Sequence, residues 1–182
     1  LYPFRRILTW VVFVVVWLFV QSSLPIHRLE ALILALLIER MLAEAVLPLL
    51  AVAIKWLVIG RYREGSHQLW SNYYLRWWIV DQALLLFGRG MFRHSQFGLK
   101  AYYRLMGAKI GRNVVLDHRV RIAEFDLVSI GDDCLIDDVT VRAFCLEGCR
   151  MRLNAVRIGA RSSVCTKVSV APGINIPAGT SL

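Results

Sequence analysis

Cysteine and histidine are both scarce in this chain of 182 residues, with four of each. Of the cysteines only Cys145 and Cys149 are close in sequence, and no second Cys or His pair stands near them to complete a tetrahedral zinc site. We therefore expect no metal site and four reduced cysteines, which suit a cytosolic environment. Such cysteines are most often small buried hydrophobes, and a nucleophilic Cys145 is the alternative.

Charge is also limited, and it is unevenly spread. Charged residues make up 19% of the chain and hydrophobic residues 57%, which is too apolar for an ordinary soluble domain and implies a membrane. The net charge of +9 comes mostly from residues 61–113, where nine Lys or Arg stand against two acids. Such a basic belt beside a bilayer meets anionic headgroups, at about 1 kcal/mol per cation. Nucleic acid is the weaker alternative, because no nucleic-acid-binding motif accompanies the charge.

Two apolar runs, residues 7–20 and 29–59, predict a transmembrane helical hairpin over residues 1–60. The first run extends to residue 24 before Pro25 stops a helix, and about 18 helical residues reach close to the roughly 30 Å hydrocarbon core. The second run exceeds that core and contains Arg40 and Glu44, which can pair on one helix face. The alternatives are a polar substrate path for this pair and a cleaved signal peptide for the first run. Lys and Arg on the outer flanks of both runs place the chain's two ends on the cytosolic side.

Residues 61–106 predict basic, aromatic juxtamembrane helices. At helical spacing one stripe is formed by Trp70, Tyr73, Tyr74, Trp77, Val80 and Leu84. A helix so rich in indole and phenol beside a basic flank is typical of the headgroup layer. Stacking on carbohydrate or a nucleobase is the alternative for these aromatics. Residues 97–106 predict a further short helix that stops at Gly107.

An aliphatic residue returns every six positions near the end of the chain, at Ile158, Val164, Val170 and Ile176. This period is typical of a parallel β-helix, in which three six-residue units form a turn of about 18 residues. The same step continues upstream through Ile110, Leu116, Ile122, Ile130 and Ile136, with a two-residue slip around residues 125–129. Residues 144–156 interrupt the pattern, and we expect a loop there. A sandwich of short antiparallel strands is the alternative, but it predicts a period of two.

Residues 107–182 thereby resemble the hexapeptide-repeat acyltransferases, whose fold is a left-handed parallel β-helix. A closer resemblance covers about residues 45–182 and is carried by IGRYREG at 59–65, LWSNYYLRWW at 69–78, EFDL at 124–127 and IGDD at 130–133. These stretches look like the membrane-bound C-terminal region of synthetases related to non-ribosomal peptide synthetases, such as the poly-lysine synthetases and fungal adenylation-carrier-transferase enzymes. Adenylation and carrier domains precede the β-helix in that group. We therefore expect a fragment of a longer protein, in which the coil continues beyond residue 182.

The resemblance implies a thioester donor, either acyl-CoA or an acyl group on a phosphopantetheine carrier, with no cofactor bound covalently in this segment. It also implies a His general base, a residue that can titrate near the working pH. His118 is the histidine within the repeats, and the nearby acids Glu124 and Asp126 are expected to share its site. A surface histidine at a coil corner is the alternative. Relatives resemble one another in a Thr-His-Leu-Phe-Glu stretch where this chain reads AFCLE at 143–147, so Phe144 stands at the place of that histidine.

Phosphate on the donor would be gripped by cations of the loop and last turns, because Arg binds phosphate through two parallel hydrogen bonds. The candidates are Arg150, Arg157, Arg161 and Lys167. Structural ion pairs with aspartates on neighbouring coils are the alternative. A γ-type carbonic anhydrase, another protein of this fold, needs three histidines and is excluded by the single coil histidine.

The sequence therefore predicts an α+β protein: a transmembrane hairpin at 1–60, juxtamembrane helices at 61–106 and a left-handed β-helix of about four coils at 107–182. The expected function is membrane-anchored transfer of an acyl or aminoacyl group to an amine or hydroxyl within a larger synthetase. The expected partners are the lipid bilayer, the upstream adenylation and carrier domains, and other coils in a trimer or pseudo-trimer. The alternative is a non-catalytic scaffold that docks or oligomerises the synthetase at the membrane.

Overall fold

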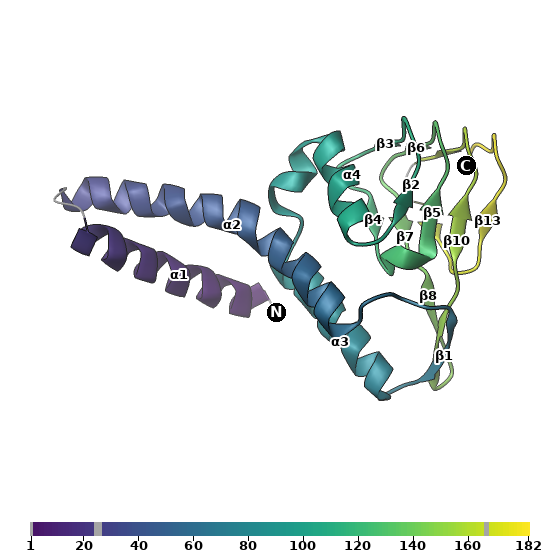
Figure 1. The fold of residues 1–182 in the computed structure, drawn as a ribbon, viewed down its shortest axis with the longest axis horizontal. Coiled ribbons are helices and arrows are strands. Elements are labelled where there is room, and N and C mark those ends of the chain that lie inside the picture. Colours follow the sequence, from purple (N-terminus) through teal and green to yellow (C-terminus); the bar gives the residue numbers. More distant parts are fainter. Residues whose placement is uncertain (1, 24–26, 166–167) are drawn as a thin grey trace.

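The computed structural model describes residues 2–23, 27–165 and 168–182. Two long helices project from a β-rich body, and further helices lie between the projection and that body (Figure 1). The chain is a mixed α+β protein whose helices precede parallel sheets, as the sequence predicts. Pro25 and Lys167 lie outside the described residues.

Helices α1 (Tyr2–Ser23) and α2 (Arg28–Val58) lie side by side (Figure 1). Among the described residues, α2 is the one helix long and apolar enough to cross a membrane, by length and composition. The apolar stretch Trp10–Ser23 of α1 is shorter, so the first span stays a prediction.

The predicted pairing of Arg40 with Glu44 is wrong within the described part of α2. The Glu44 carboxylate instead faces His94, with 3.9 Å between Oε2 and Nε2. His94 belongs to the 3-10 helix η1 (Gly90–His94), which packs on α2. Gly90 permits this close packing, because a Cβ there would lie 2.5 Å from the Cγ of Pro48.

Helix α3 (Asn72–Phe87) begins at Ser71, whose Oγ accepts a hydrogen bond from the Tyr74 amide at 3.3 Å. Its aromatic stripe does not face outward as the sequence suggested. Trp70 at the start of the stripe is 78% exposed, but Trp77 is only 7% exposed. Tyr73, Tyr74 and Leu84 pack against the hydrophobic core. The exposed apolar residues of α3 lie elsewhere on the helix, at Leu75, Trp78, Ile79 and Leu85. The stripe is therefore core-facing because residues far along the chain cover it.

Helix α4 (Gln96–Leu105) confirms the predicted short helix and packs on the first strands of the coil. It buries Leu99, Tyr102 and Tyr103, with Met106 just beyond its end, in the same cluster as the coil interior. The first turn of a repeat structure exposes apolar interior unless it is capped. Helix α4 supplies that cap.

Three parallel sheets form the coil, and each turn of the chain adds one strand to each sheet. The sheet orders are β13-β10-β5-β2, β11-β6-β3 and β12-β7-β4. The strands are β2 (Lys109–Ile110), β3 (Val115–Leu116), β4 (Arg121–Ile122), β5 (Val128–Ile130), β6 (Leu135–Ile136), β7 (Thr140–Val141), β10 (Val156–Ile158), β11 (Ser163–Val164), β12 (Ser169–Val170) and β13 (Asn175–Ile176).

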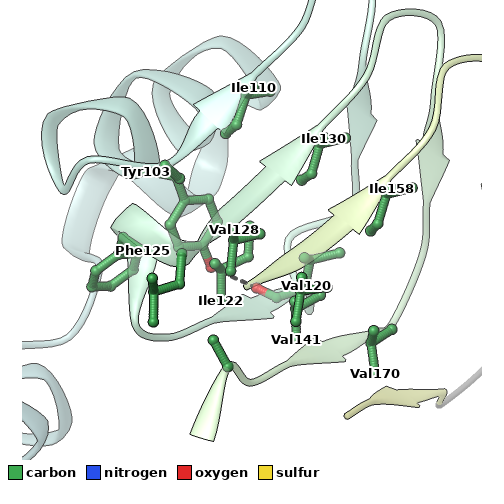
Figure 2. Close-up of a cluster of buried hydrophobic side chains, with 14 of the residues drawn as sticks. Tyr103, Ile110, Val120, Ile122, Phe125, Val128, Ile130, Val141, Ile158 and Val170 are labelled. Atoms are coloured by element: carbon green, nitrogen blue, oxygen red, sulfur yellow. Dashed lines mark hydrogen bonds between the residues drawn. The ribbon is translucent and has the colours of Figure 1, made fainter. Parts of the chain in front are cut away.

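The aliphatic residues of the repeats are aligned in the register between these strands. Ile110, Ile130 and Ile158 are paired in turn along the first sheet, and Figure 2 shows them on successive strands. The other two sheets align their aliphatic residues in the same way, including Val141 with Val170. The parallel coil is thus confirmed, and its left-handed sense stays a prediction.

The two-residue slip has a visible cause. The 3-10 helix η2 (Phe125–Leu127) is inserted between β4 and β5, and Glu124 before it adopts a left-handed backbone conformation with φ of 49°. This conformation is uncommon for a residue other than glycine. It turns the chain where the slip occurs and places the Phe125 side chain in the core.

Residues 144–156 are not the predicted loop. They contain an antiparallel hairpin of β8 (Phe144–Glu147) and β9 (Arg150–Leu153), and β1 (Gly65–Gln68) pairs with β9 to give the order β1-β9-β8. Met151 and Leu153 alternate with exposed arginines and are fully buried. That alternation of two is the ordinary strand pattern.

Candidate functional site

His118 lies at the coil corner after β3, with a side chain that is 63% exposed. Its Nδ1 lies 2.7 Å from Oδ1 of Asp117. The other oxygen of Asp117 accepts hydrogen bonds from the Arg119 backbone at 3.0 Å and its Nε at 3.1 Å. The carboxylate is therefore fixed from two sides. It orients the imidazole so that Nε2 is available to exchange a proton.

Electrostatics keep this carboxylate ionised. Burial works in the opposite direction, but hydrogen bonds from Arg119 and His118 lower the pKa of Asp117 to about 2. A second ion pair, with 3.6 Å between Nη1 of Arg119 and Oδ2 of Asp138, ties this corner to the next turn. An anionic carboxylate favours the tautomer with the proton on Nδ1, so that Nε2 can accept a proton.

A cavity of about 220 Å³ opens between this corner and the start of α4. It is lined by Arg93, His94, Ser95, Gln96, Asp117 and His118 together with two leucines. We call it the His118 cavity. Its lining combines an oriented imidazole, a carboxylate and a cation. An acid-base site that binds a polar substrate uses these kinds of group.

Glu124 is not brought to His118. Its side chain is 1% exposed, and its Oε1 accepts hydrogen bonds from Nε1 of Trp77 at 3.0 Å and from Nη2 of Arg142 at 3.2 Å. Its Oε2 accepts from the Ala143 amide at 3.0 Å. Burial raises the pKa of Glu124, and the charge of Arg142 with these hydrogen bonds offsets only part of that rise.

Arg142 links two carboxylates, because Nη2 also lies 3.3 Å from Oδ1 of Asp81 on α3. Its guanidinium carbon lies 4.4 Å from the ring centroid of Phe144, whose ring is 4.8 Å from that of Trp77. Phe144 is thus a packing partner of this arginine.

Asp126 is also engaged elsewhere. Its Oδ2 lies 2.7 Å from Nζ of Lys55 and accepts a hydrogen bond from the Tyr62 amide at 3.1 Å. Lys55 comes from the last turns of α2, so this carboxylate joins the helical projection to the coil.

The cations expected to hold the donor phosphate do not converge on one element. Arg150 is exposed on the hairpin strand β9, Arg157 on β10 and Arg161 at the following corner. In the described part of the chain none of the three forms an ion pair, so the alternative of aspartate pairing is not met.

A second cavity, of about 340 Å³, lies between α3, α4 and the coil. We call it the arginine cavity, because Arg89, Arg121 and Arg142 line it together with Asp81, Tyr102 and Tyr103. Sequence reasoning missed these residues. The contacts that assemble them join positions up to 61 residues apart, and the one local signal was the slip at Glu124.

Across the described residues, no group of three or more His, Cys, Asp or Glu side chains could hold a metal ion. The four cysteines are free thiols. Burial, reinforced by the charge of Glu147, raises the pKa of the Cys145 thiol. A raised thiol pKa disfavours the nucleophilic thiolate.

The chain is distantly similar to the delta-poly-L-ornithine synthetase of Acinetobacter baumannii. The two are 24% identical over 157 residues, which cover 82% of this chain but only 12% of the synthetase. No family model matches the sequence. Serine acetyltransferase isoform 3 from Entamoeba histolytica, solved in complex with cysteine, superposes with a TM-score of 0.25 and 17% identity over 93% of this chain and 69% of that one.

Proposed function

We propose that this segment is the membrane-anchored acyl- or aminoacyl-transferase-like domain of a larger synthetase. The observation that carries the proposal is the Asp117–His118 pair, an exposed imidazole held at 2.7 Å by an ionised carboxylate beside a cavity. The distant similarity to a region of a poly-L-ornithine synthetase supports the synthetase context. The coil would be the left-handed hexapeptide-repeat type.

In the proposed reaction, Nε2 of His118 takes the proton from an acceptor amine or hydroxyl as that group attacks the thioester carbonyl. The new C–N or C–O bond forms, the C–S bond breaks, and the proton passes from the imidazole to the departing thiolate. Asp117 holds the ring in the required tautomer and stabilises the transient imidazolium. Glu124 and Asp126 would act as positioning residues, because their hydrogen bonds fix the chain around the coil break.

The donor would be acyl-CoA or an acyl phosphopantetheine carrier. Arg150, Arg157, Arg161 and Lys167 are proposed to meet its phosphate. The exposure of Arg150, Arg157 and Arg161 suits a large, dissociable donor. Upstream adenylation and carrier domains would supply it, and a trimer or pseudo-trimer of coils would complete the site.

We also propose that the helical projection anchors the domain in a bilayer with the coil on its cytosolic face. Helix α2 has the length and composition for a span. The basic residues 61–113 follow it directly, where they can meet anionic headgroups.

The test is product formation by the full-length protein carrying His118→Gln or Asp117→Asn. Loss of a general base lowers the rate by about 10²–10⁴-fold. We expect that loss for His118→Gln and a smaller one for Asp117→Asn, with KM for the acceptor nearly unchanged. His27→Gln is the matched control, because His27 is exposed at the start of α2. Full activity of His118→Gln would refute the assignment.

A non-catalytic scaffold is the second candidate, and one observation favours it. The Phe144 ring packs against Trp77 and Arg142. The resemblance implies a histidine at this position in relatives, so a phenylalanine there favours a structural role. A scaffold predicts that His118→Gln leaves product formation intact, whereas disruption of the coil abolishes the assembly of the synthetase.

A further inference from the structure

The arginine cavity carries a charge that its own lining does not neutralise. Arg89, Arg121 and Arg142 line it against the single carboxylate Asp81. Arg142 is already shared between Asp81 and Glu124, so the remaining two cations have no carboxylate among the described lining residues. Uncompensated cations around a concave, partly desolvated space favour an anionic ligand.

Two of the three arginines are held in place rather than free in solvent. Nη1 of Arg89 lies 3.1 Å from the Tyr103 hydroxyl, and it also donates to the Val120 carbonyl. Tyr103 donates to the same carbonyl at 2.7 Å, as the dashed line in Figure 2 shows. Arg142 is fixed by its two carboxylates, and its Nε is buried without a hydrogen-bond partner among the described residues. Fixed guanidinium groups lose little further entropy when they bind an anion.

Arg121 differs from the other two. It is exposed on β4, and no hydrogen bond or ion pair engages its side chain in the described part of the chain. Planar guanidinium groups bind phosphate oxygens through paired hydrogen bonds. Two fixed arginines and a third at the rim therefore suit a phosphate group, which carries more charge than a carboxylate.

Leu84 and Leu85 of α3 add apolar side chains to the lining. Tyr102, Tyr103 and Thr140 add side chains that carry a hydroxyl group. A volume of about 340 Å³ admits a small ligand. The cavity thus offers cationic and apolar lining to the same molecule. Such lining fits a phosphate ester whose ester group is short and partly apolar.

We propose that the arginine cavity binds a phosphate ester, independently of acyl transfer at His118. Two sources share this chemistry: a soluble phosphate ester and the headgroup of a phospholipid. Both satisfy the proposal, since the same phosphate meets the same arginines.

The experiment measures binding to the full chain, with Arg121→Gln as the variant. Arg121 has no structural contact to lose, so this variant is expected to fold. Glycerol 3-phosphate is the soluble probe in detergent, with glycerol and acetate as controls. Nanodiscs with and without phosphatidic acid are the lipid probe. Arg112→Gln is the matched control, because Arg112 is also an exposed arginine of the coil but lies outside the cavity.

We expect glycerol 3-phosphate, phosphatidic acid or both to raise the unfolding temperature, while glycerol and acetate do not. Arg121→Gln should weaken that binding about tenfold, and Arg112→Gln should not. Binding to phosphatidic acid alone would assign the site to lipid, and binding to glycerol 3-phosphate would assign it to a soluble ester. The proposal is overturned if neither probe binds, if acetate binds equally well, or if both variants weaken binding to the same extent.

Discussion

The ion pair between Lys55 and Asp126 joins α2 to the coil, and its removal should destabilise the whole chain. The Lys55 side chain is fully buried, and that of Asp126 is 11% exposed. Lys55→Met keeps the length of the side chain and removes its charge. Asp126 is then left as a buried anion with the Tyr62 amide as its remaining donor.

The magnitude follows from this burial. Removing one partner of a buried pair costs about 3–5 kcal/mol, because the other charge stays desolvated. For a chain of this size each kcal/mol shifts the unfolding temperature by about 2–4 °C, so the expected loss is about 6–20 °C. Replacing both partners, as Lys55→Met with Asp126→Asn, removes the stranded charge and keeps an acceptor for Tyr62. The double variant should therefore lose less than the sum of the two single losses.

Thermal unfolding in detergent, followed by tryptophan fluorescence, measures these differences. Lys109→Met is the control, because Lys109 is an exposed lysine on the outer face of β2, and it should stay within about 0.5 kcal/mol of the parent. Strictly additive losses for Lys55→Met and Asp126→Asn would refute the pair, since contacting charges give a coupling energy of about 0.5–3 kcal/mol.

Two further predictions concern the coil. Gly131→Ala should cost about 3 kcal/mol, because its Cβ would lie 2.5 Å from the Ala160 nitrogen on the next turn. Gly148→Ala should cost about 1 kcal/mol, because the space around it is open and only its φ of 58° disfavours a side chain. Equal losses of unfolding free energy for the two variants would contradict the close approach of Gly131 to the next turn. Asp117→Asn should change how stability depends on pH. The parent carboxyl, with a pKa of 3.8 when unfolded and about 2 when folded, adds stability above pH 3.8 that disappears as the pH falls to about 2. The difference in unfolding free energy between parent and variant should therefore disappear by about pH 2. A difference that is unchanged at that pH would contradict the hydrogen bonds that Asp117 accepts.

The coil could be predicted because its signal is local and repeated. Ile158, Val164 and Val170 follow one another at steps of six, and each lies on a strand that pairs with the strand of the preceding turn. The hairpin at 144–156 was missed because its alternation of two is short and follows a run with another period. Met151 and Leu153 nevertheless show that alternation plainly.

The site was less predictable. Asp117 and His118 are neighbours in sequence, so their contact could be anticipated. The partners of Glu124 could not, because Trp77 and Arg142 reach it from elements 47 and 18 residues away. The packing of the α3 stripe against the core could not be predicted for the same reason. Amphipathic spacing identifies a helix face, but it does not show what covers that face.

Strand β1, which precedes α3, has a further consequence for how this protein can be divided. Its pairing with β9 gives the hairpin its third strand, and α4 covers the interior of the first turn. A polypeptide starting at residue 107 would expose both the open edge of β9 and the apolar end of the coil. Such exposed edges and apolar surfaces promote self-association. A preparation of the coil should therefore begin upstream of Gly65, and one that begins before Lys55 also keeps the ion pair with Asp126.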